Sequence, residues 1–123
     1  MRVVRYRLRA SPEVEAWLEA PHPDGRIAEG IQRRASHVFD RLETTGPLAG
    51  DAFFEKLADD LWEVKISSYR VFATLRGSEI LMAQVVEKKK GRLRQALINR
   101  AQDAVTAYVA IVDRESRRRR GGP

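Results

Sequence analysis

The sequence predicts a single α+β domain in which a four-stranded sheet is flanked by helices, in the order β-α-α-β-β-β-α. Its 123 residues fit one domain, and 43% hydrophobic with 33% charged residues suit a compact core beneath a charged surface. Segments with period-two hydrophobicity and segments with helical periodicity also follow one another along the chain. We expect the domain to span residues 1–112 and the basic segment 113–123 to be a disordered tail.

The first two elements are a strand and a short helix. Apolar and charged residues alternate from Arg2 to Arg9, which is typical of a strand with one apolar face. Ser11-Pro12 supplies a helix cap followed by a proline at the first helical position. We therefore expect a helix from Pro12 to about Ala20.

A longer helix follows the proline-rich loop 21–25. Apolar residues recur at intervals of three and four from about Arg26 to Thr44, and Gly46-Pro47 is a typical helix end. The segment from Leu48 to Asp60 has no clean period, so it is predicted as irregular.

The centre of the chain predicts an antiparallel meander of three strands. Its apolar runs are Leu61 to Ile66, Tyr69 to Leu75 and Ile80 to Val86. Turn residues separate the runs at Ser67-Ser68 and at Arg76 to Ser78. After these strands, an apolar stripe with helical spacing predicts a last helix from about Arg92.

The net charge of +6 is concentrated at the two ends of the chain. Four arginines precede the first acid, Glu13, and the segment from Lys88 to Arg120 is rich in lysine and arginine. Clustered cations of this kind favour a polyanion such as a nucleic acid. A solvated surface without a partner is the alternative interpretation.

Several familiar chemistries are excluded by composition. The chain has no cysteine, and its two histidines, His22 and His37, are predicted on a proline-rich loop and on a helix, so a two-histidine metal site or acid-base pair is not expected. No glycine-rich phosphate loop or other cofactor motif occurs. We expect no metal and no cofactor. No apolar run is long enough for a membrane span, so a cytoplasmic protein is expected.

Two cations are predicted to face each other across the first hairpin. If Ser67-Ser68 is a two-residue loop, Ile66 lies opposite Tyr69 and Lys65 lies opposite Arg70. Like charges at opposed positions destabilise a sheet by up to ~1 kcal/mol, which calls for an anion between them or a compensating acid. A phosphate would be the natural anion, and Glu63 the natural compensator.

A second polar strip is predicted along the last strand. If Leu75 lies opposite Glu79, then Arg70 pairs with Gln84, and Lys88 projects to the same face two pleats further on. The strand then runs into a basic junction. The residues of this junction are Glu87, Lys88, Lys89, Lys90 and Arg92.

Four segments of the chain, in this order, resemble toxins of the RelE/ParE superfamily from type II toxin-antitoxin systems. They are Ser11 to Leu18, Gly46 to Leu48, Leu61 to Lys65 and Tyr69 to Phe72. The most specific part is L-W-E-V-K followed by Y-R-V, and the HigB-like, phage-derived branch is the most similar. The resemblance implies a RelE-like fold and a ribosome-dependent mRNA interferase that is silenced by a cognate antitoxin, expected to be a helix-turn-helix protein.

The resemblance also implies roles for individual residues. The reaction would be attack of a ribose 2′-OH on the adjacent phosphate, with Arg70 clamping that phosphate and Lys65 as its basic partner. Lys88 would bind phosphate or supply a proton. RNA-binding roles fall to Gln84, Lys89, Lys90 and Arg92. The chain departs from the family at Glu87, which occupies the first place of a lysine pair and could instead serve as general base.

Two other functions remain open at this point. One is a ParE-like inhibitor that binds a topoisomerase and cleaves nothing. The other is a non-catalytic RNA-binding domain, because the histidines and C-terminal tyrosine used by some members have no clear counterpart here.

Overall fold

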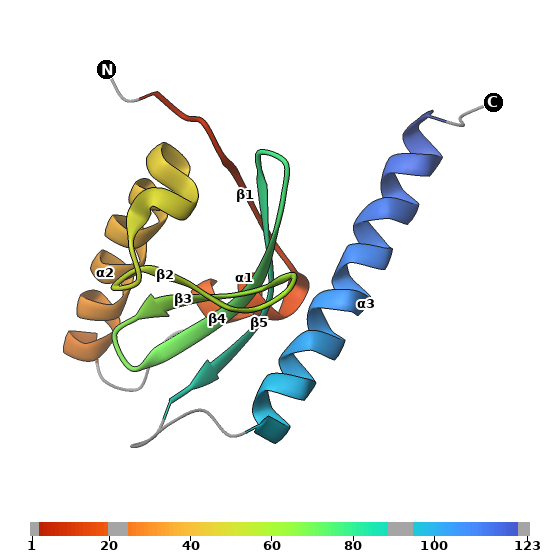
Figure 1. Ribbon diagram of the computed structural model, residues 1–123. Helices are drawn as coiled ribbons and strands as arrows, with labels where there is room; N and C mark the ends of the chain where they lie inside the picture. Colours follow the sequence, from red (N-terminus) through yellow and green to blue (C-terminus); the bar gives the residue numbers. More distant parts are fainter. Residues whose placement is uncertain (1–2, 20–24, 89–94, 121–123) are drawn as a thin grey trace.

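The computed structural model describes residues 3–19, 25–88 and 95–120. Over these residues the chain forms one five-stranded sheet with α-helices on both of its faces (Figure 1). The predicted α+β class is confirmed, and the predicted number of four strands is wrong. The strands are β1 (Arg7–Ala10), β2 (Phe54–Ala58), β3 (Leu61–Ile66), β4 (Tyr69–Arg76) and β5 (Glu79–Glu87). The helices are α1 (Pro12–Glu19), α2 (Gly25–Thr45), the short 3-10 helix η1 (Gly46–Ala49) and α3 (Gln95–Arg120).

The spatial order of the strands is β1-β5-β4-β3-β2. The strands β2 to β5 form an antiparallel meander, and β1 is added to β5 in parallel. Helices α1 and α2 cover one face of the sheet, which we call the α2 face, and α3 crosses the other, the α3 face (Figure 1). Because side chains alternate along a strand, Val64 and Ile66 of β3 enter the core under α2, whereas Leu61 packs under α3.

The strand that the sequence analysis missed is β2, at the edge of the sheet. It supplies Phe54 to the core under α2 and Leu57 to the core under α3. A register shift between Lys56 and Ala58 interrupts its pairing with β3. A short edge strand with a bulge and apolar residues on both faces has no period-two signal, which explains the wrong strand count.

The first strand is shorter than predicted. It begins at Arg7, because the backbone amides of Arg5 and Tyr6 donate to the Glu43 carbonyl at 2.8 and 3.0 Å instead of joining the sheet. Gly46 lies beside this segment with φ +52, and a Cβ there would be 2.5 Å from the Tyr6 ring. Glycine is therefore required at this end of α2.

Helix α1 begins with the predicted serine cap and also shapes β5. The Val14 amide donates to Ser11 Oγ at 3.3 Å, and Ser11 Oγ donates to the Ala83 carbonyl at 2.7 Å. The Val85 amide donates to Glu13 Oε2 at 2.9 Å. These bonds flank the point where β5 carries one extra residue relative to β4. The start of α1 thus satisfies backbone groups that the bulge removes from the ladder.

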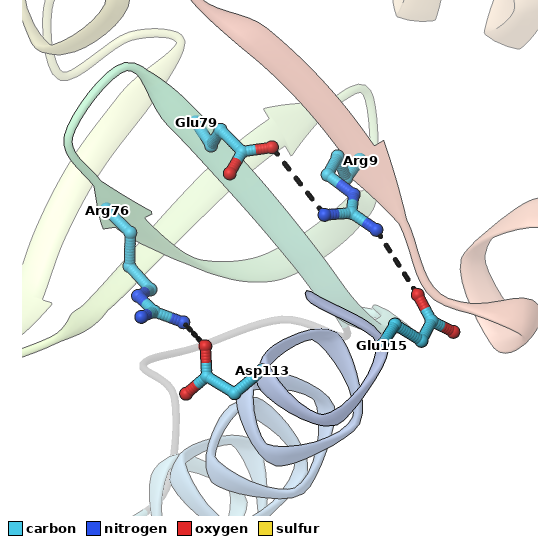
Figure 2. A network of polar contacts seen from close by, with 5 residues as sticks. All are labelled: Arg9, Arg76, Glu79, Asp113 and Glu115. Atoms are coloured by element: carbon cyan, nitrogen blue, oxygen red, sulfur yellow. Dashed lines mark hydrogen bonds and ion pairs between the residues drawn. The ribbon is translucent and has the colours of Figure 1, made fainter. Parts of the chain in front are cut away.

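Helix α3 differs from the prediction at its C-terminal end. A disordered tail is predicted from residue 113, whereas the helix continues through Arg120. The predicted start at Arg92 lies outside the described residues. Ion pairs hold the end of the helix to the sheet: Arg76 Nη1 lies 2.6 Å from Asp113 Oδ1, and Arg9 Nη2 lies 3.4 Å from Glu115 Oε2 (Figure 2). The arginines in these contacts belong to strands that are distant in the sequence, so the ion pairs could not be predicted from the residues of the helix end alone.

Candidate functional site

The first hairpin has the predicted register. Ile66 pairs with Tyr69 and Lys65 pairs with Arg70, with Ser67 at φ +54 in the turn. The prediction that the two cations are direct neighbours on one sheet face is confirmed. That face is the α3 face. Val64 and Ile66 point into the core under α2, and Lys65 lies between them on the strand, so it points to the opposite side.

The predicted pairing of Arg70 with Gln84 is wrong. Arg70 pairs with Val86, and Gln84 pairs with Phe72. Two causes combine: the turn is tighter than predicted, with Arg76 opposite Glu79, and the extra residue of β5 shifts the register beyond Phe72. Since Phe72 is in the core under α3, Gln84 still lies on the same face as Arg70.

A group of polar side chains gathers on the α3 face of β2 to β5, and we call it the polar cluster. Glu55 of β2 pairs with Glu63 of β3, which places a carboxylate row beside the row formed by the two cations. The members of the cluster are Glu55, Glu63, Lys65, Arg70, Gln84 and Lys88. Glu55 is not among the predicted site residues, because the strand that carries it was not predicted.

Each of the two opposed cations has an acidic neighbour. Lys65 Nζ lies 2.6 Å from Glu55 Oε1, and Arg70 Nε lies 3.7 Å from Glu63 Oε1. The compensating role predicted for Glu63 is therefore present, with Glu55 as a second compensator. Arg70 Nη1 also donates to the backbone carbonyls of Ser67 and Tyr69 at 2.8 and 2.9 Å. The guanidinium is thus fixed in place by its own hairpin.

The cluster contains buried polar atoms that form no hydrogen bond. Over the described residues, the buried side-chain atoms that lack a hydrogen bond are Trp17 Nε1, Glu63 Oε2, Arg70 Nε and Gln84 Oε1. Three of these four atoms belong to the cluster. A buried polar atom without a partner costs about 1–3 kcal/mol, so their concentration at one place is a sign of a site that a ligand completes.

The Glu63 carboxyl is the most buried charge of the cluster, with 4% of its surface exposed. Burial raises the pKa of Glu63, and attraction by Arg70 and then Lys65 only partly offsets this effect. Glu63 therefore takes up a proton more readily than an exposed glutamate. Each proton bound there leaves the neighbouring cations less neutralised.

Glu87, the last residue of β5, and Lys88, which follows it, face opposite sides of the sheet. Lys88 continues the ladder, since its amide donates to the Ser68 carbonyl at 2.7 Å, and its charge lowers the pKa of Glu63. Glu87 pairs with Tyr69, which packs in the core under α2. Burial and then a hydrogen bond from its hydroxyl to Glu87 raise the pKa of Tyr69. Glu87, the candidate general base, therefore does not face the polar cluster.

The remaining predicted site residues do not add to this geometry. Lys89, Lys90 and Arg92 lie outside the described residues, as does His22. His37 of α2 contacts Phe53, with ring centroids 5.8 Å apart. In the ranges that the structure covers, no group of three or more His, Cys, Asp or Glu side chains could hold a metal ion.

No helix among the described residues combines the length and the apolar character that crossing a membrane requires.

Comparison with known proteins assigns the chain to a family. A search of curated proteins found no match. A family model described as "Phage derived protein Gp49-like (DUF891)" matches residues 26–106, which is more than half of the chain. The match spans α2, the whole antiparallel meander and the first half of α3. The family is a RelE/HigB-type toxin family associated with toxin-antitoxin systems. This chain belongs to the phage-derived Gp49-like family.

Proposed function

We propose that this protein is the toxin of a type II toxin-antitoxin system, with a RelE-like fold, and that it cleaves mRNA on the ribosome at the polar cluster. The observation that carries the proposal is the set of buried atoms without a hydrogen bond, Glu63 Oε2, Arg70 Nε and Gln84 Oε1, beside two cations. Membership of a toxin family supports the biological role. The cluster supports the chemistry, because a nucleotide offers both a phosphate for the cations and polar groups for these buried atoms.

The proposed reaction is attack of a ribose 2′ oxygen on the adjacent phosphate, with loss of the 5′ oxygen. Its transition state concentrates negative charge on the phosphorus oxygens, which a fixed cation stabilises more than it stabilises the substrate. Arg70 fits this role because Ser67 and Tyr69 already hold one of its nitrogens. Lys65 would join it by exchanging Glu55 for a phosphate oxygen.

Proton transfer in the proposal falls to Glu63 and Lys88. Glu87 was the candidate base in the sequence analysis, but the carboxylate that faces the cluster with a free oxygen is Glu63. A raised pKa brings a carboxylate closer to the value that suits a general base near neutral pH. Lys88 is the proposed donor to the leaving 5′ oxygen. These side chains suffice for a reaction without metal or cofactor.

The proposed partners are the ribosome with its mRNA and a cognate antitoxin. Membership of a toxin-antitoxin family supports a cognate antitoxin, and we propose that an acidic segment of it covers the polar cluster. Co-purification of the toxin with the product of an adjacent reading frame would test this pairing. Recovery of ribosomes alone would argue against it.

A second candidate function is supported by one observation. Because both cations already have acidic neighbours, the cluster could bind RNA, or a protein such as a topoisomerase, without cleaving anything. Inducing the wild-type protein and a Lys65→Ala, Arg70→Ala double variant separates these functions. The proposal expects growth arrest and broken transcripts with the wild type alone. Intact transcripts with DNA damage would favour a topoisomerase inhibitor, and equally harmless proteins would overturn the toxin assignment.

A further inference from the structure

The C-terminal end of α3 carries a row of exposed arginines outside the family match. Residues 113–120 follow the matched region 26–106, and the side chains of Arg114, Arg117 and Arg118 are exposed. At about 100° per residue, these three side chains fall within about 100° of one another around the helix axis. They lie opposite Val112, which is buried against the sheet. We call this surface the arginine face.

The acids of this helix end point to the sheet instead of neutralising the arginine face. Asp113 pairs with Arg76 of β4 at 2.6 Å. Glu115 pairs at 3.4 Å with Arg9 of β1, which also lies 3.7 Å from Glu79 of β5 (Figure 2). Among the residues with described side chains, Arg114, Arg117 and Arg118 form no ion pair with an acid.

Such an arrangement has an energetic cost that a polyanion would remove. Like charges three and four residues apart destabilise a helix by roughly 0.2–0.5 kcal/mol per pair, and runs of like charge are usually disordered. Here the ion pairs of Asp113 and Glu115 hold the segment in helical form. The favourable position of cations at a helix C-terminus contributes as well. The result is a preformed row of positive charge.

The arginine face has little apolar area for binding a protein segment. Residues 113–120 contain no apolar side chain, and the exposed apolar residue beside them, Ile111 with 45% of its surface exposed, adds little to the contact area that an amphipathic peptide needs. All its cations are arginines, whose planar guanidinium groups bind phosphate oxygens in pairs. Dense positive charge with little apolar surface fits the backbone of a nucleic acid.

We propose that the arginine face binds the phosphate backbone of RNA, apart from the polar cluster, and supplies affinity without sequence recognition. The choice of RNA rests on the proposed function. Arg7, exposed on β1, would extend the surface, because it shares the alternation of Arg9 and so lies on the α3 face. The polar cluster would then act on an RNA that the arginine face helps to hold.

The test measures binding of the full-length chain to a short single-stranded 2′-O-methyl RNA, which cannot undergo 2′ attack. Fluorescence anisotropy compares the wild type with an Arg114→Gln, Arg117→Gln, Arg118→Gln variant. A matched control, Arg33→Gln, Arg34→Gln, Arg41→Gln, removes the same charge from α2 on the other face of the sheet. Circular dichroism and thermal melting establish that both variants fold.

We expect the arginine-face variant to bind at least ~10-fold more weakly, and its slope of log K against log salt to be shallower by about 2, since three phosphate contacts at ~0.7 each are lost. The control variant should keep both values close to wild type. Equal weakening of the two variants, or none in either, would overturn the proposal. So would unchanged RNA binding together with lost affinity for an acidic peptide.

A charge-preserving variant tests whether the arginine face binds phosphate through its charge, and the uncleavable probe separates RNA binding from cleavage. Replacing the same three arginines with lysine should keep most of the salt slope, and loss of the slope would contradict a phosphate-binding role. Because the probe cannot be cleaved, a protein that lacks nuclease activity can still show the predicted difference. Failure of the proposed cleavage and failure of this inference therefore give separate outcomes.

Discussion

The polar cluster and the arginine face both contain neighbouring cations, but only in the polar cluster do acidic side chains lie beside them. In the cluster, Lys65 and Arg70 are direct neighbours, and each has a glutamate beside it. On the arginine face, the nearby acids Asp113 and Glu115 are paired with arginines of the sheet, so the outward cations stay unopposed. The position of the acids, more than the number of cations, decides what each surface can do.

The two regions also differ in burial and in their relation to the family. The cluster lies within the matched residues 26–106, and Glu63 and Arg70 have side chains only 5% and 14% exposed. The ion pairs at the end of α3 depend on Arg9, Asp113 and Glu115, which lie outside that match. We propose that the matched region carries the chemistry and that the segments outside the match contribute affinity.

The largest expected effect is loss of cleavage on replacing Arg70. Removing one preorganised group that stabilises a transition state typically costs 10²–10³-fold in rate, and we expect a loss of about 100-fold or more for Arg70→Ala. The measurement is the rate of transcript cleavage on purified ribosomes. Arg33→Gln, on α2, should cleave at the wild-type rate.

Arg70→Ala also leaves Glu63 buried without its cation, so folding needs a separate check. Arg70→Lys keeps the charge but loses the planar group, and we expect at least ~10-fold slower cleavage with little change in melting temperature. A lysine variant that cleaves as fast as the wild type would show that the cluster does not act as a phosphate clamp.

The next effect concerns Glu55, which competes with RNA for Lys65. Glu55→Gln removes the carboxylate 2.6 Å from Lys65 Nζ, so binding of the 2′-O-methyl RNA should tighten by roughly 3- to 10-fold, a gain of about 1 kcal/mol that suits a partly exposed pair. Glu29→Gln removes an exposed acid from α2 and serves as the matched control. If both variants bind equally well, Glu55 does not oppose RNA at the cluster.

Glu63 should give the protein a pH-dependent stability. Burial raises the pKa of Glu63 in the folded state above its ordinary value of 4.5, so the folded protein binds the proton more tightly than the unfolded chain. The contribution of Glu63 to the free energy of unfolding is therefore largest below the unfolded pKa and falls as pH rises to the folded pKa.

Glu63→Gln removes this titration. We expect the difference in unfolding free energy, variant minus wild type, to increase with pH from about 4.5 upward and then to level off. Urea denaturation over a pH series measures it. A difference that stays constant, or that decreases with pH, would contradict the raised pKa.

The smallest effect belongs to the ion pairs at the end of α3. Asp113 and Arg76 are each 44% exposed, so Asp113→Asn should cost only about 0.2–1 kcal/mol. We expect faster hydrogen exchange of the amides 114–119 and unchanged exchange in the buried part of α3 around Ala101. Asp103→Asn, on an exposed position of the same helix, is the control. Equal exchange in the two variants would show that this pair does not hold the helix end.

The features predicted correctly from the sequence are those that neighbouring residues determine. The Ser67-Ser68 turn fixes the pairing of Lys65 with Arg70, and Ser11 caps the helix that follows it. The features predicted wrongly depend on contacts with segments that are distant in the sequence. Side chains at the start of α1 form hydrogen bonds with backbone groups of the bulge in β5. This bulge is one reason why Arg70 pairs with Val86 and not with Gln84.

The candidate site was predicted to a similar extent. The cationic pair and the compensating role of Glu63 followed from alternation along one hairpin. The role of Glu55 could not be predicted, because the strand that carries it has apolar residues on both faces and so no recognisable period. The helical end of α3 was missed for the same kind of reason, since Arg9 and Arg76 are remote in sequence.

The most direct test of the proposed function is the chemistry of the broken RNA ends. After induction in cells, attack by the 2′ oxygen must leave 5′-hydroxyl ends together with 2′,3′-cyclic phosphates. We expect such ends within coding sequences for the wild type and far fewer of them for Arg70→Lys expressed at the same level. Transcripts that remain intact, or ends that persist unchanged in the variant, would contradict cleavage at the polar cluster.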